Sequence, residues 1–245
     1  NAGNSIESGG DYNVAVGDEA GTAITTGDQN TFVGYTAGDA TTTASNNTAI
    51  GSKALSTDTL GSKSVAIGRA ALNVQNFTTA TDTFNVAVGY NAGTAVTTGI
   101  QNTLMGGLAG DALTDADSNV AVGYLSLSTN VLGSRNTAVG ESALFATNPD
   151  SASNTYNTAL GYHAGRLIST GVQNTIMGGL AGDAITTGNY NVAVGDGSLG
   201  SNTTAASNTA VGQAALQNNT TGATNVAIGR NSLQLNTTAS NNTAV

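Results

Sequence analysis

A five-residue phrase, with the form Asn85-Val86-Ala87-Val88-Gly89, recurs along the chain and limits the folds that the chain can adopt. Eleven of the thirteen intervals between copies are 17-residue steps, and the other two are 21-residue steps. A fixed period of this size indicates repeats that are too small to bury a core alone and therefore stack on their neighbours. The fourteen copies begin at Asn13, Asn30, Asn47, Ser64, Asn85, Asn102, Asn119, Asn136, Asn157, Asn174, Asn191, Asn208, Asn225 and Asn242.

Each repeat is numbered here from this first residue as position zero. Position one is Val or Thr, position three is Val, Ile, Leu or Met, and position four is Gly wherever the chain reaches it. Position two is Ala except at Phe32, Leu104 and Ile176. These residues predict a short strand followed by a turn. Because side chains alternate along a strand, positions one and three share one apolar face and position two lies on the other. We expect both faces to be buried.

The second half of each repeat carries one large apolar anchor at either of two places. Position eight is Leu in seven repeats, and position eleven is then polar, as with Leu55 and Asp58. Position eight is Gly in six repeats, and position eleven is then usually apolar, as with Gly21 and Ile24. Close-packed interiors resist both voids and excess volume, so this exchange indicates compensation within a thin core.

A longer, 72-residue period organises the repeats into 13–84, 85–156, 157–228 and a partial 229–245. Residues 1–12 lack the phrase and are interpreted as a lead-in to one repeat domain, residues 13–245. The extra residues of the two longer repeats fall near 74–83 and 146–155, where we expect loops that bulge from the stack. Gly, Asn and Thr interrupt every possible helix. The sequence predicts an all-β parallel β-solenoid (β-roll) of about fourteen 17-residue coils.

Composition narrows the possible functions. The net charge is −9 with only six Lys and Arg, which argues against nucleic acid and anionic membranes as partners. Cysteine is absent and no run of 18 apolar residues occurs, so neither a Cys-based metal site nor a transmembrane span is expected in this segment. The chain starts at Asn1 and stops inside a phrase at Val245, and we expect it to be cut from something longer.

Catalytic signals are weak. The only histidine, His163, falls in a turn without the partners that triad chemistry needs. Asp11 and Asp28 occupy equivalent positions one coil apart, about 5 Å by strand spacing. Such a pair can serve glycoside hydrolysis or hold a hard cation, but two turn aspartates are the simpler interpretation. We predict no enzyme, no metal and no cofactor.

A strand that is apolar on both faces favours an assembly of several chains. One face lines the inside of the coil, and the other packs on a neighbouring chain, because a thin 17-residue coil buries little apolar surface alone. We therefore predict a homo-oligomer wound around its long axis.

The phrases Ser64–Gly68 and Asn225–Gly229 resemble the signature of the YadA-like heads of trimeric autotransporter adhesins. The longer phrase 208–216, with Asn219–Gly222 after it, is similar to repeats of phage tail-fibre proteins. The resemblance covers residues 13–245 and implies a left-handed parallel β-roll, a homotrimer and binding to host surfaces. It also implies an extracellular location on a virion or a bacterial cell. The coils of the adhesin heads are usually a few residues shorter.

Two groups of residues are candidates for special roles. The Asn at position zero is predicted to form a structural ladder, because Asn tolerates left-handed backbone and its amide can stack on the next Asn. Exposed loops on a rigid scaffold commonly carry recognition, so aromatic residues in and beside the insertions are candidates for receptor binding. The ladder residues are Asn13, Asn30, Asn85, Asn102, Asn157 and Asn174. The receptor candidates are Phe77, Phe84, Phe145, Pro149, Tyr156, Tyr90 and Tyr162.

The leading hypothesis is a non-catalytic segment of a phage tail fibre or bacterial surface adhesin that attaches to a glycan or protein receptor. One alternative is a polysaccharide-degrading, tailspike-like enzyme, which needs a groove with convergent acids and aromatics. The other is an ice-binding β-solenoid, which needs a flat, regular array of Thr on an exposed face. The threonines here are expected partly in the buried strand and partly in irregular turns, which argues against that array.

Overall fold

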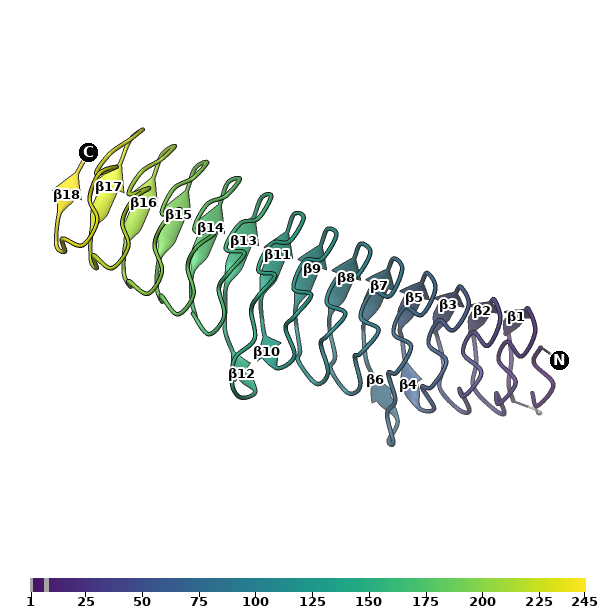
Figure 1. The fold of residues 1–245 in the computed structure, drawn as a ribbon. Coiled ribbons are helices and arrows are strands. Elements are labelled where there is room, and N and C mark those ends of the chain that lie inside the picture. The colour runs from purple at the N-terminus through teal and green to yellow at the C-terminus, as the bar shows by residue number, and fades with distance from the viewer. Residues whose placement is uncertain (1, 7–8) are drawn as a thin grey trace. The chain divides into compact units, whose positions relative to one another are not determined.

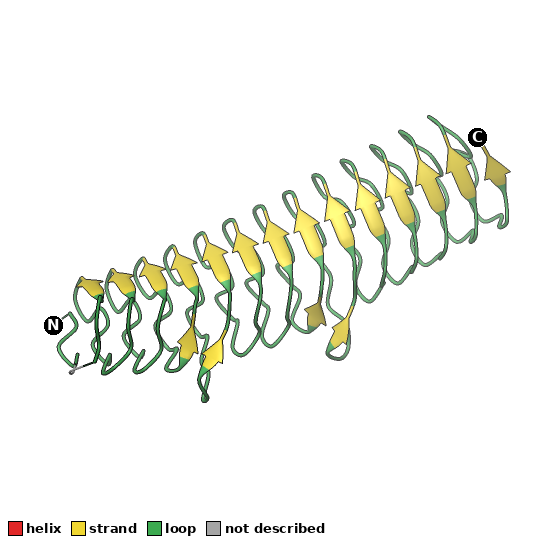
Figure 2. Ribbon diagram, turned by 180° about the vertical axis from the view of Figure 1, so that it is seen from behind, coloured by secondary structure: helices red, strands yellow, loops and turns green. Residues whose placement is uncertain are grey.

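The structure is a computed structural model and describes residues 2–6 and 9–245. The chain divides into two compact units, residues 1–119 and 120–245. Both units are parallel β-solenoids, and together they have about fourteen 17-residue coils. The described residues contain no helix. Each coil contributes one short strand to a parallel sheet, and loops and turns complete the rest of the coil (Figure 2).

The strands of the first unit pair in register, so that equivalent positions of successive coils lie side by side. Val14 pairs with Thr31, Ala15 with Phe32 and Val16 with Val33. In sheet order, the strands are β1 (Val14–Val16), β2 (Thr31–Val33), β3 (Thr48–Ile50), β5 (Val65–Ile67), β7 (Val86–Val88) and β8 (Thr103–Met105). A second, two-stranded sheet joins β4 (Gly61–Ser62) to β6 (Thr81–Asp82) at the first insertion, on the wall away from the row of longer strands (Figure 1).

The second unit repeats this plan. In sheet order, its strands are β9 (Val120–Val122), β11 (Thr137–Val139), β13 (Thr158–Leu160), β14 (Thr175–Met177), β15 (Val192–Val194), β16 (Thr209–Val211), β17 (Val226–Ile228) and β18 (Thr243–Ala244). The second insertion forms the pair β10 (Gly133–Ser134) and β12 (Ser153–Asn154). Each of the two insertions therefore adds one short parallel pair to its own coil wall.

The core of each unit is a thin column inside the coils. Position two points inward, and its larger members Phe32, Leu104 and Ile176 are fully buried, as are most of its alanines. Both kinds of anchor lie in this column, as expected: Leu55 from position eight and Ile24 from position eleven are fully buried. An added Cβ at Gly21 would lie 2.8 Å from Ile24 Cδ1, so Gly at position eight leaves the space that the other anchor fills.

The coil closes through residues with left-handed backbone. Non-glycine residues at position six, Leu at position eight and the residue before position zero all have positive φ, as at His163 (55°), Leu199 (50°) and Tyr190 (58°). Left-handed backbone costs most L-residues about 1 kcal/mol or more, and neighbouring coils stabilise it here through hydrogen bonds. The N–H of His163 donates to Glu141 O at 3.0 Å, for example.

The lead-in already follows the coil. The Gly3 N–H donates to Ala20 O at 2.9 Å, and one coil later the Gly21 N–H donates to Ala37 O at 3.0 Å. Gly3 and Gly21 also share left-handed backbone, with φ 59° and 58°. The Ile6 N–H donates to Gly3 O in the way that the Ile24 N–H donates to Gly21 O. Residues 3–6 therefore occupy the second half of a coil although they lack the phrase.

The outer face of the strands differs from expectation. Position two is buried, but positions one and three are half-buried or exposed, with Val14 49 % and Val16 55 % exposed. The prediction that both faces of the strand are buried is therefore wrong for the single chain. The physical reason is that the coil interior has room for one face only, and the other points outward.

Candidate functional site

The outer sheet face is a continuous surface of each unit, and we define it as positions one and three of the strands. These positions hold only Val, Thr, Ile, Leu and Met, so the face carries no charge. In the first unit Ile50 and Met105 are exposed on it, and in the second unit Met177 and Ile228. Parallel pairing in register stacks identical positions at the strand spacing of about 4.8 Å. The result is a regular, uncharged strip.

The Asn residues at position zero form a hydrogen-bonded column beside the strands. The Asn174 N–H donates to Asn157 Oδ1 at 3.0 Å, and Asn174 Nδ2 donates to Gly188 O at 2.9 Å. The same two bonds link Asn102 to Asn85 and to Ala116 O. Asn30, Asn85, Asn102, Asn157 and Asn174 are fully buried, and Asn13 is half-buried.

The first insertion is anchored by a buried polar network, while residues 78–80 of its loop are exposed to solvent, as expected of a loop that bulges from the coil. The Asp58 carboxylate accepts the N–H groups of Gly61 and Phe77 and the Nε2 of Gln75, the last at 2.6 Å. Gln75 Oε1 in turn accepts Asn85 Nδ2 at 2.8 Å. Phe77, a receptor candidate, is only 6 % exposed and lies within the coil wall. Its ring is therefore a packing element of the insertion.

The second insertion is anchored in a similar way, and residues 150–154 of its loop are exposed. Pro149 is buried, and its Cδ lies 3.2 Å from the place of a Cβ on Gly133. Phe145 is half-buried, and its carbonyl accepts the Thr129 hydroxyl at 2.6 Å. Asn130 replaces the aspartate of the first insertion and bonds to both the N–H and the C=O of Gly133. Of the candidates in the two insertions, Phe77 and Pro149 thus lie away from solvent.

The remaining aromatic candidates lie at the surface, and a Lys or Arg side chain lies over most of their rings. Lys63 Nζ lies 5.1 Å from the ring centre of Phe84, which is 51 % exposed. Arg135 lies over Tyr156 at 5.7 Å, and its Nη1 donates to the Tyr156 hydroxyl at 2.8 Å. These two pairs occupy equivalent positions of the first two long repeats. Arg69 covers Tyr90 at 5.6 Å in the same manner.

Tyr162 has a different partner. Its ring stacks on His163 with centroids 3.8 Å apart and an angle of 16° between the planes. The four remaining aromatic candidates therefore lie along the coil surface, and each of their rings has one face already occupied by a neighbouring side chain.

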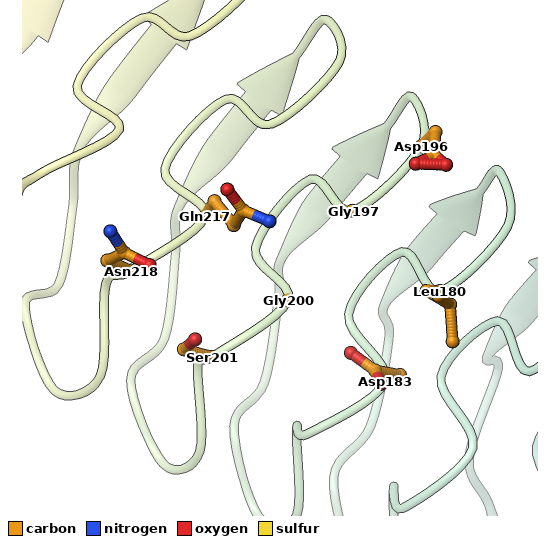
Figure 3. Close-up of a pocket in the computed structure, with 8 residues that line it drawn as sticks. All are labelled: Leu180, Asp183, Asp196, Gly197, Gly200, Ser201, Gln217 and Asn218. Carbon is orange, nitrogen blue, oxygen red and sulfur yellow. The ribbon is translucent and has the colours of Figure 1, made fainter.

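A polar notch lies on the second unit, and sequence analysis did not single it out. It is a cavity of about 260 Å³ beside the turns that follow β14, β15 and β16 (Figure 3). Gly197 and Gly200 line it at positions six and nine of one coil, and no other repeat has Gly at either position. The notch is lined by Leu180, Asp183, Asp196, Gly197, Gly200, Ser201, Gln217 and Asn218.

Burial raises the pKa of the Asp183 carboxyl in this notch above its usual value. Backbone hydrogen bonds and the nearby His163 and Arg166 lower that pKa and offset part of the effect. Asp183 is therefore a partly desolvated carboxylate. The two glycines that replace larger residues, Gly197 and Gly200, are the sequence signal that marks this place.

The pair Asp11 and Asp28 has a structural arrangement. Asp28 Oδ1 accepts the Asp11 N–H at 2.8 Å, and the Asp28 N–H donates to Ser45 Oγ at 2.9 Å. The Asp28 side chain thus links one coil turn to the preceding one, as the simpler interpretation of two turn aspartates expects.

Comparison of the chain with protein-family models, with curated proteins and with solved structures finds no match in any of the three. Within the described residues, no helix has the length and apolar character that crossing a membrane requires.

Proposed function

We propose that the chain is a non-catalytic, extracellular fibre segment in which three left-handed solenoids pack through their outer sheet faces and present their remaining walls for attachment to a cell-surface receptor. The observation that carries this proposal is the uncharged outer face of a parallel sheet, which has Val, Ile, Leu or Met at every position three. Parallel sheets occur almost only with both faces covered. Here one face lines the core and the other is open in the single chain.

A second copy of the chain is the partner that fits this face best. The face repeats at every coil with the same register, so another copy offers the same spacing and the same absence of charge. Contiguous exposed apolar patches mark interaction sites, and closed rotational symmetry is the usual form of a homo-oligomer. The number three, the handedness and the location on a virion or bacterial surface are supported by the resemblance to adhesin heads and tail-fibre repeats.

Light scattering on the purified protein tests the assembly. The expected mass is three times the 24.0 kDa of the chain. Replacing Val194 by Asp in β15 places an unpaired charge in the interface of each copy, at a cost of several kcal/mol per buried charge. We expect this variant to have the mass of one chain while its circular dichroism spectrum keeps the β signal.

The matched control is Thr204→Asp, which adds the same charge at an exposed turn of the same coil. This control should keep the mass of three chains. A wild-type mass of one chain, or equal behaviour of the two variants, contradicts the proposal. Attachment is tested separately, by binding of the labelled oligomer to bacterial cells and to glycan arrays.

A second candidate function is ice binding, which one observation favours. The strand threonines were expected to be buried, but they lie on the open outer face, where Thr158 and Thr175 stand on paired strands. This function needs a flat, regular array of Thr, and position one of this face holds Thr in eight of the fourteen repeats and Val in the others. A thermal-hysteresis assay on the protein tests for ice binding. The absence of hysteresis at millimolar concentration rejects this candidate.

A further inference from the structure

We infer that the polar notch on the second unit binds one ring of a neutral saccharide. This inference rests on the proposed attachment function and deepens it, because it names the ligand class and the residues that hold it. Four properties of the notch support it: its shape, the placement of its donors and acceptors, its charge and its apolar edge.

The shape of the notch results from missing side chains. At position six the adjacent coil has Leu180, where this coil has Gly197, and at position nine it has Asp183, where this coil has Gly200. A Cβ at Gly197 would meet only Gln217 Nε2, at 3.5 Å, so the space is open. The cavity of about 260 Å³ lies just below the roughly 300–1,000 Å³ of pockets for drug-sized ligands. Its size therefore suits a single small ring.

A donor and an acceptor lie on opposite sides of the glycine turn. Gln217 Oε1 accepts Gln234 Nε2 at 2.9 Å, which directs the Gln217 Nε2 group toward Gly197. On the other side, Asp183 Oδ1 lies 3.6 Å from the place of a Cβ on Gly200. Figure 3 shows both side chains reaching toward the turn between them. Sugar hydroxyls both donate and accept, so neighbouring hydroxyls of one ring can bond to both groups.

Ser201 and Asn218 extend this polar lining along one side of the notch. Their hydroxyl and amide groups can also donate and accept, which again matches hydroxyl groups of a sugar. Leu180, 42 % exposed, supplies an apolar edge for the C–H groups of the ring. A few polar groups beside an apolar surface are typical of small-molecule sites.

The charge of the notch selects against acidic sugars. Two carboxylates, Asp183 and Asp196, line it, and none of its lining residues is Lys or Arg. A carboxylated or sulfated sugar would meet like charges at short range, which is unfavourable. Hydroxyl donors, in contrast, form stronger hydrogen bonds with a carboxylate than with a neutral acceptor. The ligand class is therefore a neutral pyranose.

Saturation-transfer NMR on the whole protein tests the inference. The probes are glucose, galactose, mannose and N-acetylglucosamine, with glucuronic acid and sialic acid as acidic counterparts and CaCl₂ as a cation. We expect transfer to at least one neutral sugar and none to the acidic ones. Replacing Gly197 by Leu fills the notch, and Asp183→Asn removes the charged acceptor; each should weaken binding about tenfold or more.

The filling variant has a precedent within the chain. Leu occupies position six with left-handed backbone at Leu108, Leu125 and Leu180, so Gly197→Leu is expected to fold. The matched control is Asn231→Leu, the same position outside the notch, which should bind sugar like the wild type. The inference is overturned if no neutral sugar receives transfer, if only an acidic sugar or calcium binds, or if Gly197→Leu binds as well as the control.

The solution mass of the same samples separates this inference from the proposed function. If the protein is an oligomer of three chains and binds no sugar, the proposed fibre assembly is kept and the notch is rejected as a saccharide site. If the protein is a single chain and binds a neutral sugar, the fibre assembly is rejected and the notch is kept as a saccharide site.

Discussion

Two neighbouring glycines, Gly178 and Gly179, allow the coil-to-coil contact to be tested with a minimal change. Gly178 is at position four and has φ 135°, and a Cβ there would lie 2.7 Å from both the carbonyl carbon and the oxygen of Gly195 in the next coil. Gly179 has no atom within 4 Å of the place of its Cβ. Replacing each by Ala removes the same backbone freedom from the unfolded chain, so this entropy term cancels between the two variants.

The difference between the variants follows from the two local effects at Gly178. An unfavourable φ for an L-residue costs about 1–3 kcal/mol. Forcing a methyl group against packed backbone costs about 1–3 kcal/mol more. The coils around it are joined by short bonds, from Gly178 N to Leu160 O at 2.8 Å and from Gly195 N to Met177 O at 2.7 Å, which the methyl group would stretch.

We expect Gly178→Ala to be less stable than Gly179→Ala by about 2–6 kcal/mol. Gly179→Ala itself should match or exceed the wild type by up to about 1 kcal/mol. The assay is guanidinium unfolding at one protein concentration, followed by circular dichroism, with amide hydrogen exchange to locate the loosened coils. Equal midpoints for the two alanine variants would refute the argument that position four is glycine because the coils approach too closely for a side chain.

Three further predictions follow from the core and its polar groups. Leu199→Gly should lower the free energy of unfolding by about 2–5 kcal/mol, because it leaves a cavity in the core. Adding Asn202→Ile moves the apolar anchor to position eleven and should recover most of this loss, as measured by the denaturant midpoint. Asn174→Ala leaves the Gly188 carbonyl without its side-chain donor and should cost about 1–3 kcal/mol, with faster amide exchange in the adjoining coils. Burial raises the pKa of Asp39, so its contribution to stability is full below about pH 4 and is lost as pH rises through the folded pKa. Asp39→Asn should therefore raise the thermal midpoint near neutral pH and leave it unchanged near pH 3; a gain of equal size at both pH values would contradict this assignment.

The sequence predicts the solenoid well because its signals are local and repeated. Each strand is placed by the same β-branched residues before a glycine, and each anchor by the exchange between positions eight and eleven, as with Leu199 and Ile185. What the period leaves open is which strand face points inward. The small residue at position two fits the narrow coil, so the larger Val194 is turned outward.

The candidate sites were harder to predict, because they depend on what lies between coils. The composition of the first insertion does not show that Phe77 is held in the coil wall by Asp58. The hydrogen bond from the Phe77 N–H to Asp58 Oδ1 joins residues that are 19 apart in the sequence. The notch was missed for a related reason. Gly197 and Gly200 break the repeat pattern at positions six and nine, but Gly197 lines a cavity only when its neighbours Leu180 and Gln217 are placed beside it.

The buried carboxylate of Asp58 has a consequence for how the chain finds its coil order. Repeats this similar can pair one coil out of phase and keep most of their strand contacts, so slippage is a hazard of uniform solenoids. Among the described residues, the Asp58 carboxylate accepts hydrogen bonds from Gln75 and Phe77 of the longer coil and from Gly61 in its own turn. A slip by one coil would leave this carboxylate buried without the donors of the longer coil. The insertion thus favours the correct order of coil pairing. A slip of one coil at this insertion is therefore unfavourable, and the outer sheet face takes no part in this penalty.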